Sequence, residues 1–228
     1  MSCAVIYDLP KEMSKPLARF LGFMVADGVI TSSGFSLGKQ WKEVVEQFCE
    51  DVEYLFGYEC KSKMYHIPST VEGGLGMWKV ECASKFLRDF LRNIEGINSN
   101  NKGVPTIIKQ AKREYIIEFL RAVFEDGTVR LKRGAVDSVN LQLKDENIIT
   151  DIQQMLLNLG IITSKKQRIN SKAPNTHHIL YIYGENIDLY YKENGFFTKF
   201  KQDRLVVNEG RKRLVDQNII GGASFVCA

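Results

Sequence analysis

Apolar and polar positions follow two different periods along this chain, and the order of the periods is repeated. Each half opens with an apolar helical stretch, rich in small residues, that ends on an acid and a glycine, first at Asp27 and Gly28 and again at Asp126 and Gly127. Glycine is common just past the end of a helix. A carboxylate at the tip of an apolar helix is unusual, so two such ends predict two helices packed side by side with their acids together.

The stretches that follow the two acids also repeat one another. A β-rich segment comes first, over 29–38 and 128–143, and then an amphipathic helix with apolar residues spaced three and four apart, ending at Gly57 or Gly160. A basic strand, a further strand and a short helix close each half. The repeat predicts an internal duplication and an α+β fold, with two pseudo-symmetric αββαββα halves that each contain an antiparallel sheet and meet at a two-helix interface.

The repeat also suggests the domain boundaries. The segment before the second half is polar and contains Gly103 and Pro105, which is typical of a linker. We expect Phe196, Phe197 and Phe200 to dock the C-terminal segment onto the body of the protein. The expected division is a first half at 1–97, a linker at 98–105, a second half at 106–195 and a C-terminal extension at 196–228.

The composition is typical of a globular protein without membrane spans or disulfides. The 228 residues are 44% hydrophobic and 25% charged, as in ordinary soluble globular proteins, and they contain neither an apolar run of the roughly 18 residues that a membrane span needs nor a signal peptide. We therefore expect a soluble intracellular protein with no targeting signal and no membrane partner. The five cysteines are scattered without Cys-x-x-Cys spacing, which favours reduced thiols over disulfides or zinc ligands.

The formal net charge is only +4, so the placement of the basic residues is more informative than their number. On the predicted strands, polar and basic residues alternate with apolar ones, and alternate residues share a face of a sheet. Acids are scarce on the polar face, whereas a merely solvated face mixes both signs of charge. Basic, amide and hydroxyl side chains bind phosphates and base edges. The residues expected to contact nucleic acid are Thr31, Ser33, Ser36, Lys61, Lys63, Tyr65, Lys79, Arg130, Lys132, Ser138, Asn140, Gln142, Lys166, Arg168, Asn170 and His177.

The doubled helix end resembles the LAGLIDADG homing endonucleases, in their monomeric form with two motifs. Residues 20–28 match the nine-residue consensus at its Gly, Ala, Asp and Gly positions. When the second motif is aligned on Asp126, Arg121 falls where a small residue is usual. The resemblance covers roughly residues 15–195. It implies an intron-encoded, site-specific endonuclease that hydrolyses one phosphodiester on each strand of a long, asymmetric double-stranded DNA target.

The same resemblance implies a metal site. In this family the acids at the helix tips bind divalent cations beside the scissile phosphates, which implies Mg²⁺, or another divalent ion such as Mn²⁺, at Asp27 and Asp126. The backbone carbonyls of Ala26 and Glu125 would be secondary ligands. Carboxylate and carbonyl oxygens are the hard ligands that Mg²⁺ prefers.

The family also places basic or amide side chains near the metals, where the second strand meets the following helix. This role carries over to Lys39 or Gln40 in the first half and to Lys144 in the second. A lysine there would organise water or stabilise charge on the phosphate in the transition state.

Other functional classes stay open. One alternative is a non-cutting, RNA-binding intron maturase of the same fold, whose partner would be its own intron RNA. Another is a transcription regulator of this fold that has lost its acids. The retained Asp27 and Asp126 favour the enzyme, because a pure binding protein has no need of paired acids. We do not expect an intein, because the sequence ends without the His-Asn pair that self-splicing requires.

Overall fold

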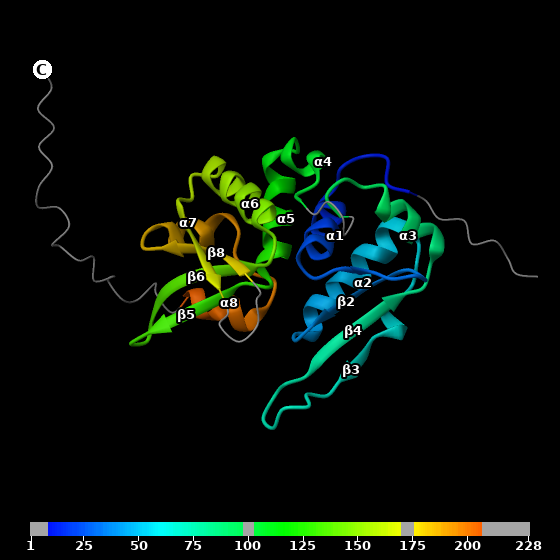
Figure 1. The fold of residues 1–228 in the computed structure, drawn as a ribbon, viewed down its shortest axis with the longest axis horizontal. Coiled ribbons are helices and arrows are strands. Elements are labelled where there is room, and N and C mark those ends of the chain that lie inside the picture. The colour runs from blue at the N-terminus through cyan, green and yellow to red at the C-terminus, as the bar shows by residue number, and fades with distance from the viewer. Residues whose placement is uncertain (1–8, 98–102, 170–175, 207–228) are drawn as a thin grey trace, which may run out of the picture.

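The computed structural model describes residues 9–97, 103–169 and 176–206, which form two halves of the same topology (Figure 1). The first half consists of α1 (Lys15–Ala26), β1 (Val29–Ile30), β2 (Phe35–Lys39), α2 (Lys42–Phe56), a 3-10 turn η1 (Lys61–Lys63), β3 (Tyr65–Ile67), β4 (Met77–Cys82) and α3 (Lys85–Arg92). The second half consists of α4 (Thr106–Lys109), α5 (Arg113–Phe124), β5 (Thr128–Lys132), β6 (Ala135–Leu143), α6 (Glu146–Asn158), β7 (Thr163–Ile169), β8 (Thr176–Tyr183) and α7 (Asn186–Glu193), and α8 (Lys199–Val206) follows it.

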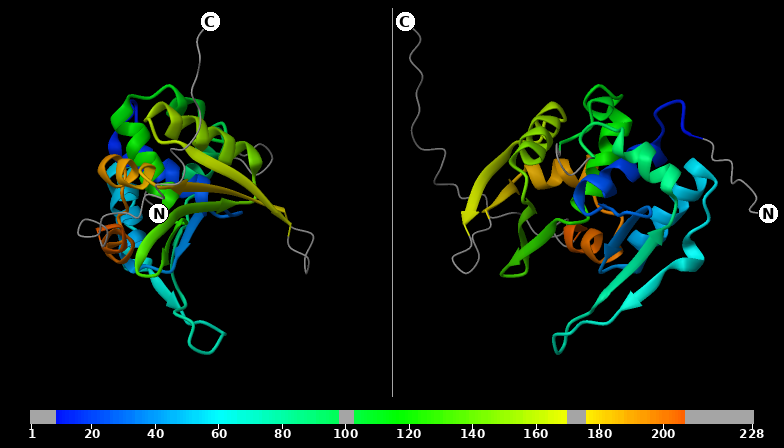
Figure 2. Two further views of the ribbon diagram at one scale, coloured as in Figure 1. Left: turned by 90° about the vertical axis from the view of Figure 1, so that its left-hand side faces the viewer. Right: turned by 45° about the vertical axis from the view of Figure 1, so that its right-hand side comes forward.

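Each half contains one antiparallel sheet of four strands. The strand orders are β1-β2-β4-β3 and β5-β6-β8-β7, so corresponding strands occupy corresponding places. Most of the helices lie on one side of the molecule and the two sheets extend toward the other side as two arms, with α8 at the junction of the two halves (Figure 2). This arrangement confirms the predicted α+β fold and its internal duplication.

The two motif helices, α1 and α5, pack against each other at the centre of the molecule. Gly22 makes this contact possible, because a Cβ atom at that position would lie 2.5 Å from the carbonyl oxygen of Phe119 and 2.8 Å from the Cβ of Ala122. Real Cβ atoms do not approach other atoms so closely, so only glycine allows the helices to come this near. The two helix ends therefore lie side by side, as the sequence predicted.

A buried ion-pair group also joins the halves. Arg19 of α1 binds Asp51 of α2 with both ends of its guanidinium group, at 2.7 and 3.1 Å, and Glu118 of α5 at 3.1 Å. The side chain of Asp51 is 2% exposed. Burial raises the pKa of Asp51 to about 6, although Arg19 opposes this shift. The group fixes α1 against both of its neighbouring helices.

Local signals account for most of the element boundaries. Gly57 ends α2 with a φ of 62°, a left-handed conformation that favours glycine. Asp145 caps α6, because its carboxylate accepts hydrogen bonds from the backbone N–H groups of Asn147 and Ile148. The predicted basic strand of the first half is wrong over residues 61–63, which form η1 instead of a strand.

Three further observations complete the fold. In the part of the chain that the structure describes, no helix is long and apolar enough to cross a membrane. Cys49, Cys60 and Cys82 are buried free thiols, as their scattered spacing predicted. Most of the predicted linker, the predicted contact Asn170 and the end of the C-terminal extension lie outside the described residues.

Candidate active site and nucleic-acid interface

The two motif acids stand at the ends of their helices. The backbone N–H of Asp27 donates to the carbonyl of Phe23 at the end of α1, and that of Asp126 donates to Val123 at the end of α5. The glycine after each acid closes the helix with a further hydrogen bond, 3.0 Å long in the first half and 2.7 Å in the second. Because α1 and α5 pack together, both carboxylates are held at one point between the halves.

Lys39 connects the two acids. Its Nζ lies 2.9 Å from Oδ2 of Asp27 and also contacts Oδ1 of Asp126. Lys39 is the last residue of β2 and lies on the same face of the strand as the core residues Phe35 and Leu37. Its side chain therefore points to the helix side of the sheet. It is 6% exposed. Burial lowers the pKa of Lys39, while the charge of Asp27 opposes the shift.

The two acids differ in exposure. The side chain of Asp27 is 51% exposed and that of Asp126 is 13% exposed. Oδ2 of Asp126 is buried and has no hydrogen-bond partner among the described residues. A buried carboxylate oxygen without a partner is costly, and it is therefore suited to accept a further cation or donor.

No group of three or more His, Cys, Asp or Glu residues in the described ranges is placed to hold a metal ion. A metal at this point would therefore depend on the two acids together with backbone carbonyls and water. Mg²⁺ sites in proteins are often of this kind, with one or two carboxylates and several waters.

Glu125 binds the C-terminal extension. Its carboxylate accepts hydrogen bonds from the backbone N–H groups of Phe197 and Thr198 and from the hydroxyl of Thr198. Its backbone carbonyl accepts a hydrogen bond from Nζ of Lys201 in α8. The carboxylate of Glu125 is thus occupied by structural contacts, and its carbonyl faces a lysine that the sequence analysis did not identify.

Arg121 shows why the second motif departs from the consensus. Its Nε donates to the carbonyl of Asn194 at 2.6 Å, and its guanidinium lies 5.3 Å from the centre of the Phe197 ring. The large side chain thus binds the segment that leads into α8. The expected docking of Phe196, Phe197 and Phe200 is confirmed, because their rings lie against Tyr190, Phe23 and Trp41 respectively.

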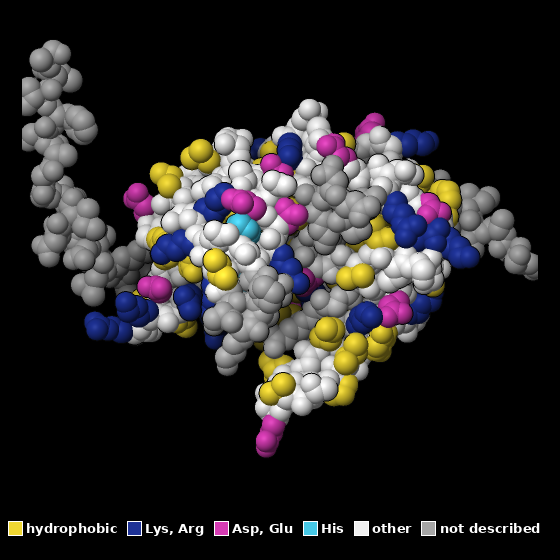
Figure 3. All heavy atoms as spheres, viewed as in Figure 1, with side chains coloured by type: hydrophobic (Ala, Val, Ile, Leu, Met, Phe, Trp, Pro, Cys, Tyr) yellow, Lys and Arg dark blue, Asp and Glu magenta, His cyan; other side chains and the backbone are white. Residues whose placement is uncertain are grey.

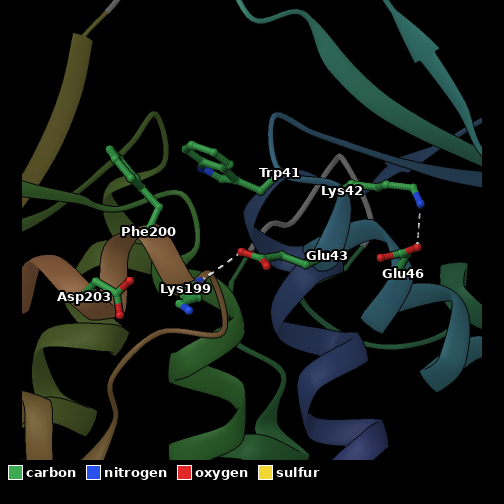
Figure 4. Close-up of a pocket in the computed structure, with 7 residues that line it drawn as sticks. All are labelled: Trp41, Lys42, Glu43, Glu46, Lys199, Phe200 and Asp203. Carbon is green, nitrogen blue, oxygen red and sulfur yellow. Dashed lines mark hydrogen bonds and ion pairs between the residues drawn. The ribbon is translucent and has the colours of Figure 1, made fainter.

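α8 also reaches the first half of the protein. The ring centres of Trp41 and Phe200 are 5.0 Å apart, and the backbone N–H of Lys199 donates to Oε1 of Glu43 at 3.0 Å (Figure 4). Contacts to Glu125 and Arg121 hold the preceding segment to the second half. The extension therefore bridges both halves beside the acids.

A cavity of about 450 Å³ opens at the acids. It is lined by side chains that include Asp27, Lys39, Gln40, Asp126, Lys201 and Arg204. The structure thus brings Lys39 and Gln40 to the acids, as predicted, but Lys144 is exposed and does not line this cavity. Lys201 and Arg204 were missed, because nothing in their local sequence connects them to a helix tip so distant in the chain.

The second sheet has the expected polar open face. Strand pairing sets Arg130 opposite Ser138, Asn140 opposite Tyr181, and Arg168 opposite His177, and opposite residues of antiparallel strands share a face. The open face also includes Gln142 and Lys166, whereas Val139, Leu141 and Leu180 point into the core. Lys132 is exposed beyond a bulge in β5. Here the alternation that the sequence shows is confirmed.

The open face of the first sheet carries exposed apolar side chains. Strand pairing places Val29, Tyr65, Ile67 and Met77 on it, and these side chains are 36–55% exposed. Figure 3 shows hydrophobic side chains gathered along the β3–β4 hairpin and Lys and Arg side chains around the β5–β6 hairpin. The two arms therefore offer different chemistry.

The prediction of a basic open face on the first sheet is wrong. Lys61 pairs with Glu50 and Lys63 with Tyr58, both from η1 and not from a strand. Lys79 and Tyr65 do lie on the open face, but both bind Glu81.

The remaining predicted contacts of the first half lie near the same sheet edge. Ser36 is on the open face but 4% exposed, between Val29 and Glu81. Thr31 and Ser33 lie in the turn between β1 and β2, where the hydroxyl of Thr31 accepts from the N–H of Gly34.

Comparison with known proteins agrees with this architecture. Residues 114–195 match the family model of the LAGLIDADG-like domain. A structure of I-DmoI in complex with DNA and Mn superimposes with a TM-score of 0.53 at 12% identity, covering 78% of this chain and 96% of that one. The N-terminal LAGLIDADG domain of DUF199/WhiA superimposes with a TM-score of 0.56 at 17% identity, covering 84% of this chain and 86% of that one.

The curated relatives are much longer proteins. A glutamine–fructose-6-phosphate aminotransferase of Methanocaldococcus jannaschii is 26% identical over 203 residues, which is 86% of this chain but 18% of the relative. A DNA polymerase of Thermococcus hydrothermalis is 26% identical over 180 residues, 72% of this chain and 10% of the polymerase. This chain thus spans about a fifth or less of the length of these relatives.

The paired motif helices, the repeated sheets and the family match lead to one assignment. The chain contains a LAGLIDADG-like domain at residues 114–195, and over most of its length it has the two-motif LAGLIDADG fold of the homing endonuclease I-DmoI.

Proposed function

We propose that this protein is a metal-dependent, site-specific DNA endonuclease that cuts both strands of a long, asymmetric target. The observation that carries the proposal is the meeting of Asp27, Asp126 and Lys39 at one point between two sheet arms. A protein that only binds nucleic acid has no need to hold two carboxylates together at its centre. I-DmoI and the LAGLIDADG domain of DUF199/WhiA share this fold, so the paired acids carry the proposal and the fold does not.

The residues at the helix tips fit a divalent cation such as Mg²⁺. Oδ2 of Asp126 is buried without a partner among the described residues, and Asp27 is half exposed beside it. These carboxylates and the carbonyl of Ala26 are hard oxygen donors, whereas the carbonyl of Glu125 already accepts a hydrogen bond from Lys201. When bound, the cation would polarise a phosphoryl oxygen and lower the pKa of a bound water.

The chain's own side chains supply the rest of the chemistry. Hydrolysis joins the oxygen of a water to phosphorus while one P–O ester bond breaks; the water loses a proton to solvent, and the leaving oxygen gains one. Lys39 and Gln40 line the cavity at the acids, where they can orient that water and donate hydrogen bonds to the phosphate. Their contribution is greatest when they are already positioned before charge develops on the phosphate.

The two sheets would bind the major groove on either side of the cut. The second sheet presents Arg130, Asn140, Lys166 and Arg168, which suit phosphates and the hydrogen-bonding edges of bases. The exposed apolar side chains of the first sheet suit the methyl groups of thymine instead. The two half-sites of the target should therefore differ in base composition.

One similar structure supports the proposal. I-DmoI has been crystallised with DNA and Mn. The aminotransferase and polymerase activities belong to relatives of which this chain spans only 18% and 10%, so they do not carry over to it.

The test is cleavage of a plasmid library with randomised sites, in Mg²⁺ and in EDTA, by the wild type and by Asp27→Asn. We expect Mg²⁺-dependent cuts at one long asymmetric sequence, lost in the variant. No cuts, together with tight retention of a structured RNA in EDTA, would replace the endonuclease with the maturase.

A further inference from the structure

The second half has no lysine at the position that corresponds to Lys39. Val29, two residues after Asp27, pairs with Ser36 of β2. Thr128, two residues after Asp126, pairs with Asn140 of β6. Counting three residues onward from each partner gives Lys39 in β2 and Leu143 in β6. The pairing across the sheet agrees, because Lys39 faces Trp78 and Leu143 faces His178. The helix-facing end of β6 is therefore apolar where β2 has its buried ammonium group.

A lysine from elsewhere in the chain reaches the end of the second motif helix. Nζ of Lys201 donates to the carbonyl of Glu125 and lies 3.6 Å from its carboxylate. Lys201 is 9% exposed and lines the same cavity as Asp126 and Lys39. Two buried lysines thus lie at the paired helix ends. Lys39 contacts both motif acids and Lys201 contacts Glu125, and the two lysines come from unrelated elements.

The extension is held firmly enough to position this lysine. The turn before α8 is fixed by three hydrogen bonds to the carboxylate of Glu125, and α8 itself is fixed to the first half through Phe200 and the backbone of Lys199. Arg204, one turn further along α8, stacks on Phe200 and points to the carbonyl of Val129. Figure 2 shows α8 at the junction of the two halves.

We propose that Lys201 is the active-site lysine of the second half, supplied by the C-terminal extension in place of the residue at Leu143. Its ammonium group contacts the phosphate of the DNA strand that is cut beside Asp126 and stabilises the negative charge that develops there. Lys201 gains or loses no covalent bond in this step. The proposal rests on the proposed endonuclease function and adds an asymmetric origin for its two lysines.

The experiment follows each strand of the target separately. A duplex that carries the recovered target, with a different label on each strand, is cut by the full chain as wild type, Lys201→Met, Lys201→Arg and Lys199→Met. Lys199 is the matched control, because it lies on the same helix but is exposed and does not line the cavity at the acids. Thermal unfolding of each variant shows whether it is folded.

We expect Lys201→Met to slow cleavage of one strand at least about 100-fold, the typical cost of removing one donor to a transition-state oxyanion, and the other strand much less, so that nicked DNA accumulates. Lys201→Arg should restore cleavage of the affected strand in part, and Lys199→Met should cut like the wild type. In EDTA, Lys201→Met should also reduce the slope of log affinity against log salt by about 0.9, as the loss of one phosphate contact does.

Other outcomes overturn the proposal. Equal slowing of both strands, or no slowing, would show that Lys201 has a structural role or none. If Lys201→Met does not fold, the Lys201→Arg variant is used in its place. If Lys201→Arg folds and cuts both strands at equal rates, the proposal is wrong. A wild type that cuts neither strand would refute the proposed endonuclease function. A wild type that cuts, together with a Lys201→Met variant that cuts equally well, would refute only the role of Lys201.

Discussion

Replacing Lys39 with methionine tests the electrostatics of the site without any knowledge of the target. The change removes the ammonium group that contacts both acids and leaves the mostly buried Asp126 without the cation that it contacts. Breaking a buried ion pair by removing one partner costs about 3–5 kcal/mol. Asp27 is half exposed, so water replaces most of what it loses. We therefore expect the low end of that range, about 3 kcal/mol.

A loss of this size is easy to measure. In a chain of this length, 1 kcal/mol corresponds to roughly 2–4 °C in Tm, so Lys39→Met should melt roughly 6–12 °C below the wild type by calorimetry at neutral pH. Adding Asp126→Asn to Lys39→Met should recover most of the loss, because the amide carries no charge. Mg²⁺ should raise the Tm of Lys39→Met more than that of the wild type, since the acids are then free to bind it.

The matched control is Lys79→Met, which removes an exposed ion pair on the same sheet and should cost less than about 1 kcal/mol. If Lys39→Met is no less stable than Lys79→Met, or if Asp126→Asn recovers nothing, Lys39 does not hold the acids together as described.

Three further predictions concern the helix interface and the open faces. Gly22→Ala should destabilise the protein by more than 1 kcal/mol in urea denaturation, because the new methyl group would overlap the backbone of Phe119; unchanged stability would mean that the helices are further apart. Arg19→Met should cost about 3–5 kcal/mol, and more at pH 7 than at pH 5. Burial raises the pKa of Asp51 to about 6 even with Arg19 beside it, and loss of Arg19 raises this pKa further. The variant therefore loses stability relative to the wild type as the pH rises above about 6. Arg130→Ala should weaken DNA binding in EDTA and flatten its salt dependence, as measured by fluorescence anisotropy, and an unchanged slope would remove the residue from the phosphate contacts.

Much of the fold could be predicted because its signals are local and occur twice. The acid and glycine after each motif helix, the left-handed Gly57 and the cap at Asp145 each depend on a few neighbouring residues. The repeat then gave the topology, since one unit had to fold like the other. The alternation along β6 also predicted the open face of the second sheet correctly.

The failures have physical causes. Lys61 and Lys63 alternate like strand residues, but η1 forms there instead, with Glu59 accepting hydrogen bonds from the backbone and hydroxyl of Ser62. Lys201 could not be found from local pattern, because its contact with Glu125 depends on how α8 docks far along the chain. Lys144 was predicted to lie at the acids, but it comes one residue after Leu143, which occupies the position in β6 that faces the helices.

The most direct test of the central claim is to compare cutting and binding for the two acids on the recovered target. Asp27→Asn and Asp126→Asn are measured for double-strand cleavage in Mg²⁺ and for affinity in Ca²⁺. The account predicts that each variant loses double-strand cutting while it keeps its DNA affinity and its fold. Full cutting by either variant, or loss of affinity together with the fold, would show that the paired acids are not the site of cleavage.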